Sequence, residues 1–312
     1  MSLGEQGTGL PLVPMNASQF LGRRRFLALS ASVGAGAVLA ACGGSGSKGN
    51  PVSGISGDLQ VVKRYPEDAL TPGKVRLPVS LGDKNGVIPV GGKVTVPDTM
   101  HASVVDAQSG KTIASGLVAE RHDQDLNVPY WPFVADIPAA GIYLLRIDEA
   151  PGVDVSFQLM EDKYVAAPTV GRTLPPFDTP TVDDARGVDP ICTRPDGACP
   201  FHDVTLTQAL ATGKPVVYMI GTPAFCTSGT CAPGLDALIT VSKSVGDSAV
   251  FVHADVYADK NGEKIAPAVS AYKLTYEPLL YVTDAKGTIV ERIDAVFDEP
   301  ELRSILAANG IS

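Results

Sequence analysis

Cysteine is the most reactive side chain in this 312-residue chain, and its five copies are unevenly spaced. Four residues separate Cys226 from Cys231, and six separate Cys192 from Cys199. The fifth, Cys42, follows an apolar stretch near the N-terminus. Two close cysteines can form a structural disulfide, exchange disulfides with a substrate or bind a metal ion, so their surroundings must decide between these chemistries.

Basic and apolar residues near the N-terminus form two motifs. The run Arg23-Arg24-Arg25-Phe26-Leu27 precedes an apolar stretch that is too short to span a membrane, and the pattern resembles a twin-arginine export signal. The stretch ends in Leu39-Ala40-Ala41-Cys42, which is similar to a bacterial lipobox. These resemblances imply a signal peptide over residues 1–41 and a lipid on Cys42 that holds the protein at the extracytoplasmic face of the cell membrane. A plain cleaved signal and an uncleaved anchor are the alternatives.

The charge of the mature chain limits its partners. Loss of residues 1–41 removes three of the 25 Lys and Arg and one of the 34 Asp and Glu, which leaves 22 against 33 and a formal charge of −11. This balance argues against nucleic acid and against electrostatic binding to an anionic membrane surface. The destination is oxidising, so an even number of remaining cysteines favours disulfides. We therefore expect a structural Cys192–Cys199 disulfide and no cofactor or bound metal.

Composition divides the first part of the mature chain. Residues 42–57 are rich in Gly and Ser and predict a flexible tether. Residues 58–165 hold short apolar runs between turn signals, and 153–159 alternates regularly between apolar and polar side chains. This spacing predicts an antiparallel β-sandwich of the immunoglobulin-like type. Residues 166–200, rich in Pro and Asp, predict a linker that carries Cys192 and Cys199.

Residues 201–312 change to alternating helix and strand patterns. Apolar spacing predicts helices over 206–213, 234–246 and 266–274 and after Asp298 or Glu299, with strands over 215–221 and 249–257 and a strand pair in 278–293. Cys226 and Cys231 fall between the first of these strands and the next helix, where open α/β sheets place their chemistry. The chain is therefore expected to contain two domains, an all-β sandwich followed by an α/β domain.

A family resemblance sharpens this expectation. The run KPVVYMIGTPAFCTSGTCAPGLD resembles the strand, active-site loop and helix start of thioredoxin-like domains, and Thr275-Tyr276-Glu277-Pro278 falls where that family has its cis-proline loop. The resemblance covers about the last third of the chain. It implies a thioredoxin-like fold in which Glu277 and Pro278 position a substrate peptide. The chain departs from the family in having four residues between the cysteines, and in placing Ile220 where the family has a buried acid.

Geometry assigns different roles to the two cysteines. A disulfide needs Cα atoms about 4.4–6.8 Å apart, whereas five positions along one helix span about 7.5 Å. Cys226 is therefore expected in the loop, with Gly229 turning the chain back toward Cys231 and Thr227 or Ser228 capping the helix. A helix N-terminus stabilises a thiolate. We predict thiol–disulfide exchange on exported proteins, supplied by a redox partner, with Cys226 as nucleophile and Cys231 as resolving thiol.

Several alternatives remain open. The main one is a non-enzymatic surface binding or scaffold lipoprotein with structural disulfides only. Cys192 and Cys199 could instead form a second dithiol that exchanges with the first pair, whereas a four-thiolate zinc site is disfavoured by the compartment and the spacing. A copper chaperone of the Sco type needs a distant histidine, but His253 is interpreted as a core residue and His202 as a surface residue. Residues 222–226 are faintly similar to a peroxiredoxin loop, without a nearby arginine.

Overall fold

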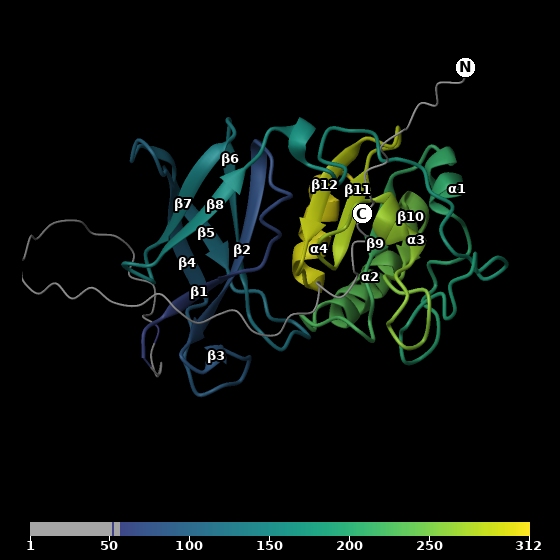
Figure 1. Ribbon diagram of the computed structural model, residues 1–312, viewed down its shortest axis with the longest axis horizontal. Coiled ribbons are helices and arrows are strands. Elements are labelled where there is room, and N and C mark those ends of the chain that lie inside the picture. Colours follow the sequence, from purple (N-terminus) through teal and green to yellow (C-terminus); the bar gives the residue numbers. More distant parts are fainter. Residues whose placement is uncertain (1–51, 53–56) are drawn as a thin grey trace, which may run out of the picture. The chain divides into compact units, whose positions relative to one another are not determined.

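Strands make up most of the regular structure in the computed structural model, which describes Val52 and residues 57–312 (Figure 1). Strands account for 33% and helices for 16% of the described residues. The described strands form three sheets of four strands each. The predicted export motif, with Arg23, Arg24, Phe26 and Leu27, and the predicted lipidation site at Cys42 lie outside the described residues, as does most of the predicted tether.

Two antiparallel sheets are built from residues 60–159. The first contains β1 (Gln60–Lys63), β2 (Gly73–Asp83), β3 (Gly86–Val87) and β6 (Trp131–Ile137). The second has the order β5-β4-β7-β8, with β4 (Thr99–Asp106), β5 (Thr112–Glu120), β7 (Gly141–Ile147) and β8 (Asp154–Leu159). Buried side chains of both sheets meet in one hydrophobic cluster, which includes Leu77, Val104, Phe133 and Leu145. In β8 the predicted alternation is confirmed, because Val155, Phe157 and Leu159 are buried and their neighbours are exposed.

The third sheet carries the Cys226/Cys231 region. Its order is β10-β9-β11-β12, from β9 (Val216–Ile220), β10 (Val250–Ala254), β11 (Leu279–Thr283) and β12 (Ile289–Asp294). Only β9 and β10 run parallel, and the other two pairs are antiparallel. The α-helices are α1 (Leu206–Ala211), α2 (Cys231–Val245), α3 (Pro267–Ala271) and α4 (Glu299–Ala308), and short 3₁₀ turns occupy η2 (Asp162–Tyr164) and η3 (Gly246–Ser248).

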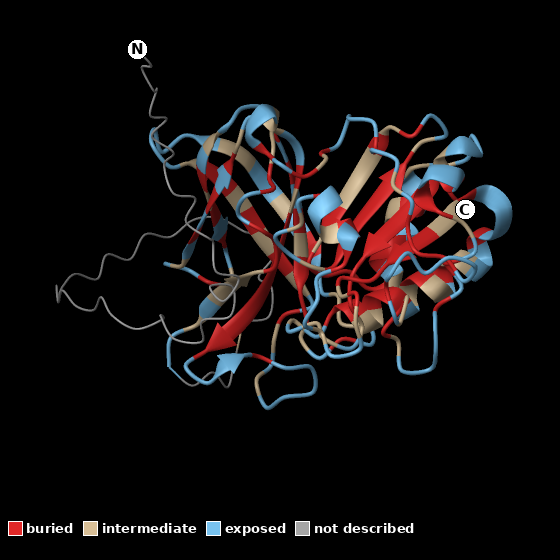
Figure 2. Ribbon diagram, turned by 45° about the vertical axis from the view of Figure 1, so that its right-hand side comes forward, coloured by how far each residue is buried: buried red, intermediate tan, exposed pale blue. Residues whose placement is uncertain are grey.

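Every residue of β9 is buried, which explains its continuous apolar sequence. Val217 and Met219 belong to a hydrophobic cluster with residues of α2 and α4, whereas Tyr218 and Ile220 belong to a second cluster with residues of α1 and α3. Figure 2 shows the same pattern, with buried residues along the central strands and exposed residues on the outer turns. The strand is thus fixed on both faces, and the loop that follows it starts from a rigid position.

The expected fold class is corrected by this architecture. The sequence predicted an immunoglobulin-like sandwich followed by an α/β thioredoxin-like domain, but the described chain is mostly β-sheet with few helices and shows no such α/β arrangement. Two of the four described α-helices are only five and six residues long. Apolar periodicity located these segments correctly but could not report how little helix they would form, because tertiary packing sets the ends of short helices.

The predicted linker is well packed. Within residues 166–200 no helix or named strand occurs, yet Leu174 and Val188 are buried. The amide of Leu174 donates to the carbonyl of Gly287 over 2.8 Å, and the amide of Asp189 donates to the carbonyl of Ala258 over 3.1 Å. The described residues 57–312 accordingly belong to one compact unit.

A buried polar cluster joins β2 to α4. The guanidinium of Arg76 donates two hydrogen bonds of 2.7 Å to the carboxylate of Glu301 and one of 2.7 Å to the carbonyl of Val296. The hydroxyl of Tyr130 also donates to Glu301. Such bidentate pairing satisfies charges that would be costly to bury alone.

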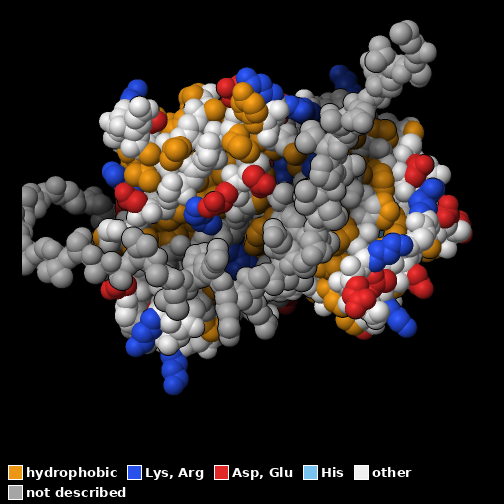
Figure 3. Space-filling model, in the orientation of Figure 1, with side chains coloured by type: hydrophobic (Ala, Val, Ile, Leu, Met, Phe, Trp, Pro, Cys, Tyr) orange, Lys and Arg blue, Asp and Glu red, His pale blue; other side chains and the backbone are white. Residues whose placement is uncertain are grey.

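On the face drawn in Figure 3 the visible acidic and basic side chains are mixed. Among the described helices none has the length and apolar character needed to cross a bilayer.

Candidate active site

The loop between β9 and α2 carries both cysteines of the closer pair. Cys226 lies in this loop, and Cys231 is the first residue of α2. The amide of Gly229 donates to the carbonyl of Cys226 over 3.2 Å, and Gly229 has a φ of 68°, as the predicted turn required. The predicted cap is wrong: Thr230 occupies the N-cap position, and its hydroxyl donates to the carbonyl of Ala295 over 2.7 Å instead of capping the helix.

The sulfur of Cys226 is partly exposed and surrounded by donors. Its Sγ lies 3.1 Å from the hydroxyl oxygen of Ser228. A hydrogen bond from the thiol of Cys231, helped by the Ser228 hydroxyl and by the backbone N–H groups of Cys231 and Thr230, lowers the pKa of Cys226 to about 4. Cys226 is therefore a thiolate at neutral pH, and the first turn of α2 supplies part of its stabilisation.

The sulfur of Cys231 has the opposite surroundings. Its side chain is completely buried, and burial raises the pKa of the Cys231 thiol far above its usual value. The hydrogen bond between its thiol and Cys226 and the nearby charge of Glu277 also raise this pKa. The pair thus divides into an accessible thiolate and a buried thiol that keeps its proton.

Glu277 brings a carboxyl group to this pair. The Sγ of Cys231 lies 3.7 Å from its Oε2, which also accepts the amide hydrogen of Thr222 over 3.2 Å. Burial, followed by the charge of Cys226, raises the pKa of Glu277 to about 7. The Sγ atoms of Cys226 and Cys231 and a carboxylate oxygen of Glu277 all lie within 4.8 Å of one another.

The sequence predicted that Glu277 and Pro278 would lie near the cysteines, but not that the carboxyl group of Glu277 would contact Cys231. The Glu277–Pro278 peptide bond is cis, as expected. Ile220 is buried and apolar, so it cannot handle protons. A carboxyl group lies near Cys231 instead at Glu277, the residue before Pro278, and an ionisable residue at that position was the available signal.

Close packing at Gly221 fixes the loop against the buried thiol. A Cβ at this position would lie 3.1 Å from the methyl carbon of Met219, 3.3 Å from Cβ of Pro278 and 3.5 Å from Sγ of Cys231. The absence of a side chain therefore lets the loop approach both Cys231 and Pro278.

The second cysteine pair lies near the same loop, since Thr193, next to Cys192, accepts the amide hydrogen of Ala224. Cys192 and Cys199 are buried and are free thiols in the structure, so their predicted disulfide stays a prediction. Beside them are two histidines, of which His253 is buried in β10 as expected. The interpretation of His202 as a surface residue is wrong, because only 1% of it is exposed.

Comparisons with known proteins find no match for this chain. The chain matches no model of a known protein family, and no curated protein matches its sequence.

Proposed function

We propose that this protein is a thiol–disulfide oxidoreductase in which Cys226 attacks and Cys231 resolves. One observation carries the proposal: the sulfur of the partly exposed Cys226 lies within 4.8 Å of the sulfur of the buried Cys231, at the start of α2. These surroundings lower the pKa of Cys226 and raise that of Cys231. A structural pair needs no such difference, whereas an exchange catalyst needs one sulfur ready to attack and a second held in reserve.

The reaction in the reducing direction has two displacements. The thiolate of Cys226 attacks one sulfur of a substrate disulfide, forms a mixed disulfide and releases the other substrate sulfur as a thiolate. Cys231 then loses its proton and attacks the Sγ of Cys226, which releases the second substrate sulfur and leaves a Cys226–Cys231 disulfide. The substrate gains two electrons and the protein loses two. Run backwards, the same steps oxidise a substrate dithiol.

Glu277 is the proton acceptor for the second displacement. Cys231 cannot attack while protonated, and burial keeps its proton on at neutral pH. The carboxylate of Glu277 is placed to take this proton, because its Oε2 lies 3.7 Å from the Sγ of Cys231. In the reduced protein burial and the charge of Cys226 raise the pKa of Glu277 to about 7, whereas in the mixed disulfide only burial acts, so a larger fraction of Glu277 is ionised there and can accept the proton.

We further propose that the chain acts outside the cytoplasm, held to the cell membrane by a lipid on Cys42. Its partners there are thiols or disulfides of exported proteins and a protein that restores its redox state. The motif around Arg23 and Arg24 and the lipobox ending in Cys42 support this address. Membrane release of the Cys42→Ala variant tests it, and unchanged membrane retention contradicts it.

Exchange with a fluorescent peptide disulfide tests the chemistry. We expect Cys226→Ser to abolish reduction of the peptide and Cys231→Ser to accumulate a mixed disulfide on Cys226, detectable by mass spectrometry of the intact chain. Thr227→Ala is the matched control, because Thr227 is exposed between the two cysteines. Retained exchange in Cys226→Ser would support a binding or scaffold protein with structural cysteines instead.

A further inference from the structure

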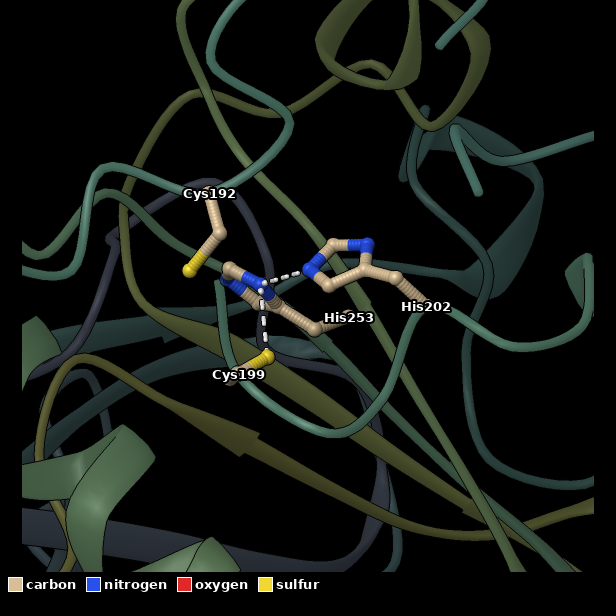
Figure 4. Close-up of side chains that lie close together, drawn as sticks. All are labelled: Cys192, Cys199, His202 and His253. Carbon is tan, nitrogen blue, oxygen red and sulfur yellow. Dashed lines mark hydrogen bonds between the residues drawn. The ribbon is translucent and has the colours of Figure 1, made fainter. Parts of the chain in front are cut away.

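Two cysteines and two histidines from separate segments meet beside the candidate active site. Cys192, Cys199 and His202 belong to the irregular segment before α1, and His253 belongs to β10. All four side chains are buried, and their ligand-type atoms lie within 4.8 Å of one another. Figure 4 shows the sulfur atoms and ring nitrogens converging around His253.

Two distances within this cluster match those between the ligands of a tetrahedral metal site. Zinc binds sulfur at about 2.3 Å and imidazole nitrogen at about 2.0–2.1 Å, which places two nitrogens about 3.3 Å apart and a nitrogen about 3.6 Å from a sulfur. Nδ1 of His253 lies 3.3 Å from Nε2 of His202 and 3.5 Å from Sγ of Cys199. These atoms already have the spacing of ligands around one ion.

The outer nitrogens of both imidazoles are held by backbone carbonyls. Nε2 of His253 lies 3.0 Å from the carbonyl oxygen of Gly221, and Nδ1 of His202 lies 3.2 Å from that of Pro180. A carbonyl only accepts, so each outer nitrogen donates its N–H and each inner nitrogen presents a lone pair. Hydrogen bonds of this kind orient the histidines of metal sites and fix their tautomers.

We propose that Cys192, Cys199, His202 and His253 bind one Zn²⁺ ion, which takes the place of the Cys192–Cys199 disulfide predicted from the sequence. The donor set of two thiolates and two neutral imidazoles is one that tetrahedral zinc takes in structural sites. Binding converts both thiols to thiolates and releases two protons, without any change of oxidation state. All four ligands come from the protein and are buried, so the site is closed and structural.

This ion would support the loop of the proposed active site without belonging to it. His253 contacts the carbonyl of Gly221, at the start of the loop that leads to Cys226. Thr193, next to Cys192, accepts the amide hydrogen of Ala224 in the same loop over 3.2 Å. The metal site nevertheless does not depend on the redox proposal, since its ligands are a separate set of residues.

Metal analysis of the purified full-length chain tests this proposal. We expect one zinc per chain, and we expect Co²⁺ added to the metal-free reduced protein to give the visible bands of a tetrahedral site with sulfur-to-cobalt charge transfer. The thiols of Cys192 and Cys199 should react with a disulfide reagent only after a chelator removes the metal. These measurements use the wild-type chain and do not depend on a variant that folds.

Variants locate the site. Cys192→Ser and His202→Gln should each lose the stoichiometric metal and the cobalt bands, whereas Cys226→Ser should keep both. A Cys192–Cys199 disulfide in the isolated native protein would overturn the proposal, and so would free thiols at both positions with no binding of Zn²⁺ or Co²⁺. Because the measured quantities are metal content and spectra, failure of the exchange assay would not affect them.

Discussion

Replacement of Cys231 by alanine should raise the pKa of the Cys226 thiol. The hydrogen bond from Cys231 is the largest cause that lowers this pKa to about 4, from an ordinary value of 9.0. The Ser228 hydroxyl and the backbone N–H groups of Thr230 and residue 231 remain in the variant. The pKa of Cys226 should therefore move upward without reaching the value of a free cysteine.

The low pKa of Cys226 has two opposite effects on its rate of reaction: it increases the fraction of thiolate and lowers the nucleophilicity of each thiolate. These two effects determine which assay can report the pKa. At pH 6 a pKa of about 4 gives about 99% thiolate, against about 0.1% for an ordinary thiol, a gain of about 10³-fold. Lower basicity makes each thiolate about 10²- to 300-fold less nucleophilic. The net rate advantage is only about threefold to tenfold, so a single rate does not report the pKa.

The pH dependence of alkylation does report it. The rate of iodoacetamide labelling at Cys226, followed by peptide mass spectrometry from pH 3 to 10, should have its midpoint near pH 4 in the wild type and at higher pH in Cys231→Ala. Cys192 and Cys199 are scored as separate peptides. A wild-type midpoint between 8 and 9, or one that Cys231→Ala leaves unchanged, would refute the reasoning.

Two further predictions concern Glu277 and Thr193. Glu277→Gln should slow the resolution of the mixed disulfide on the order of 10²-fold and remove its rise with pH, because the wild-type carboxylate accepts a proton only above its pKa. The midpoint of this rise should lie below about 7, since the charge of Cys226 that raises the pKa of Glu277 is absent in the mixed disulfide. Rapid-quench mass spectrometry measures this step, and an unchanged pH profile would contradict the role. Thr193→Val should lower the free energy of unfolding by about 1–3 kcal/mol, because it leaves the amide of Ala224 without its acceptor and removes one of the three hydrogen bonds to the carboxylate of Asp255. Thr193→Ser keeps the hydroxyl and should recover most of this loss in denaturant unfolding; equal destabilisation by both variants would argue against it.

Local patterns predicted the elements around the site well. The continuous apolar run at 215–221 became β9, and the apolar stripe at 234–246 became most of α2. Cys226 in the loop and the positive φ of Gly229 followed from the length of chain between the two cysteines. The fold class did not follow, because the proportion of helix depends on how far each short helix extends in its tertiary surroundings.

Contacts between distant segments were beyond the sequence patterns. Glu277 lies 46 residues from Cys231, and His253 lies 54 residues from Cys199. No spacing rule connects such pairs. The pairing of β11 with β9 brings Glu277 toward the loop that follows β9, and the amide of His253 donates to the carbonyl of Phe201, which holds the segment of Cys199 next to β10. His202 was misjudged for the same reason: a polar residue after a proline-rich segment gave no sign that carbonyl and imidazole partners would surround it.

The redox equilibrium of the Cys226/Cys231 pair tests the central claim most directly. The native protein is equilibrated with mixtures of reduced and oxidised glutathione, quenched in acid and mapped by mass spectrometry. We predict a Cys226–Cys231 disulfide that forms and breaks reversibly across the glutathione range and is reduced by dithiothreitol without denaturant. A bond at these residues that resists dithiothreitol until the chain unfolds, or sulfurs that never pair, would contradict the account.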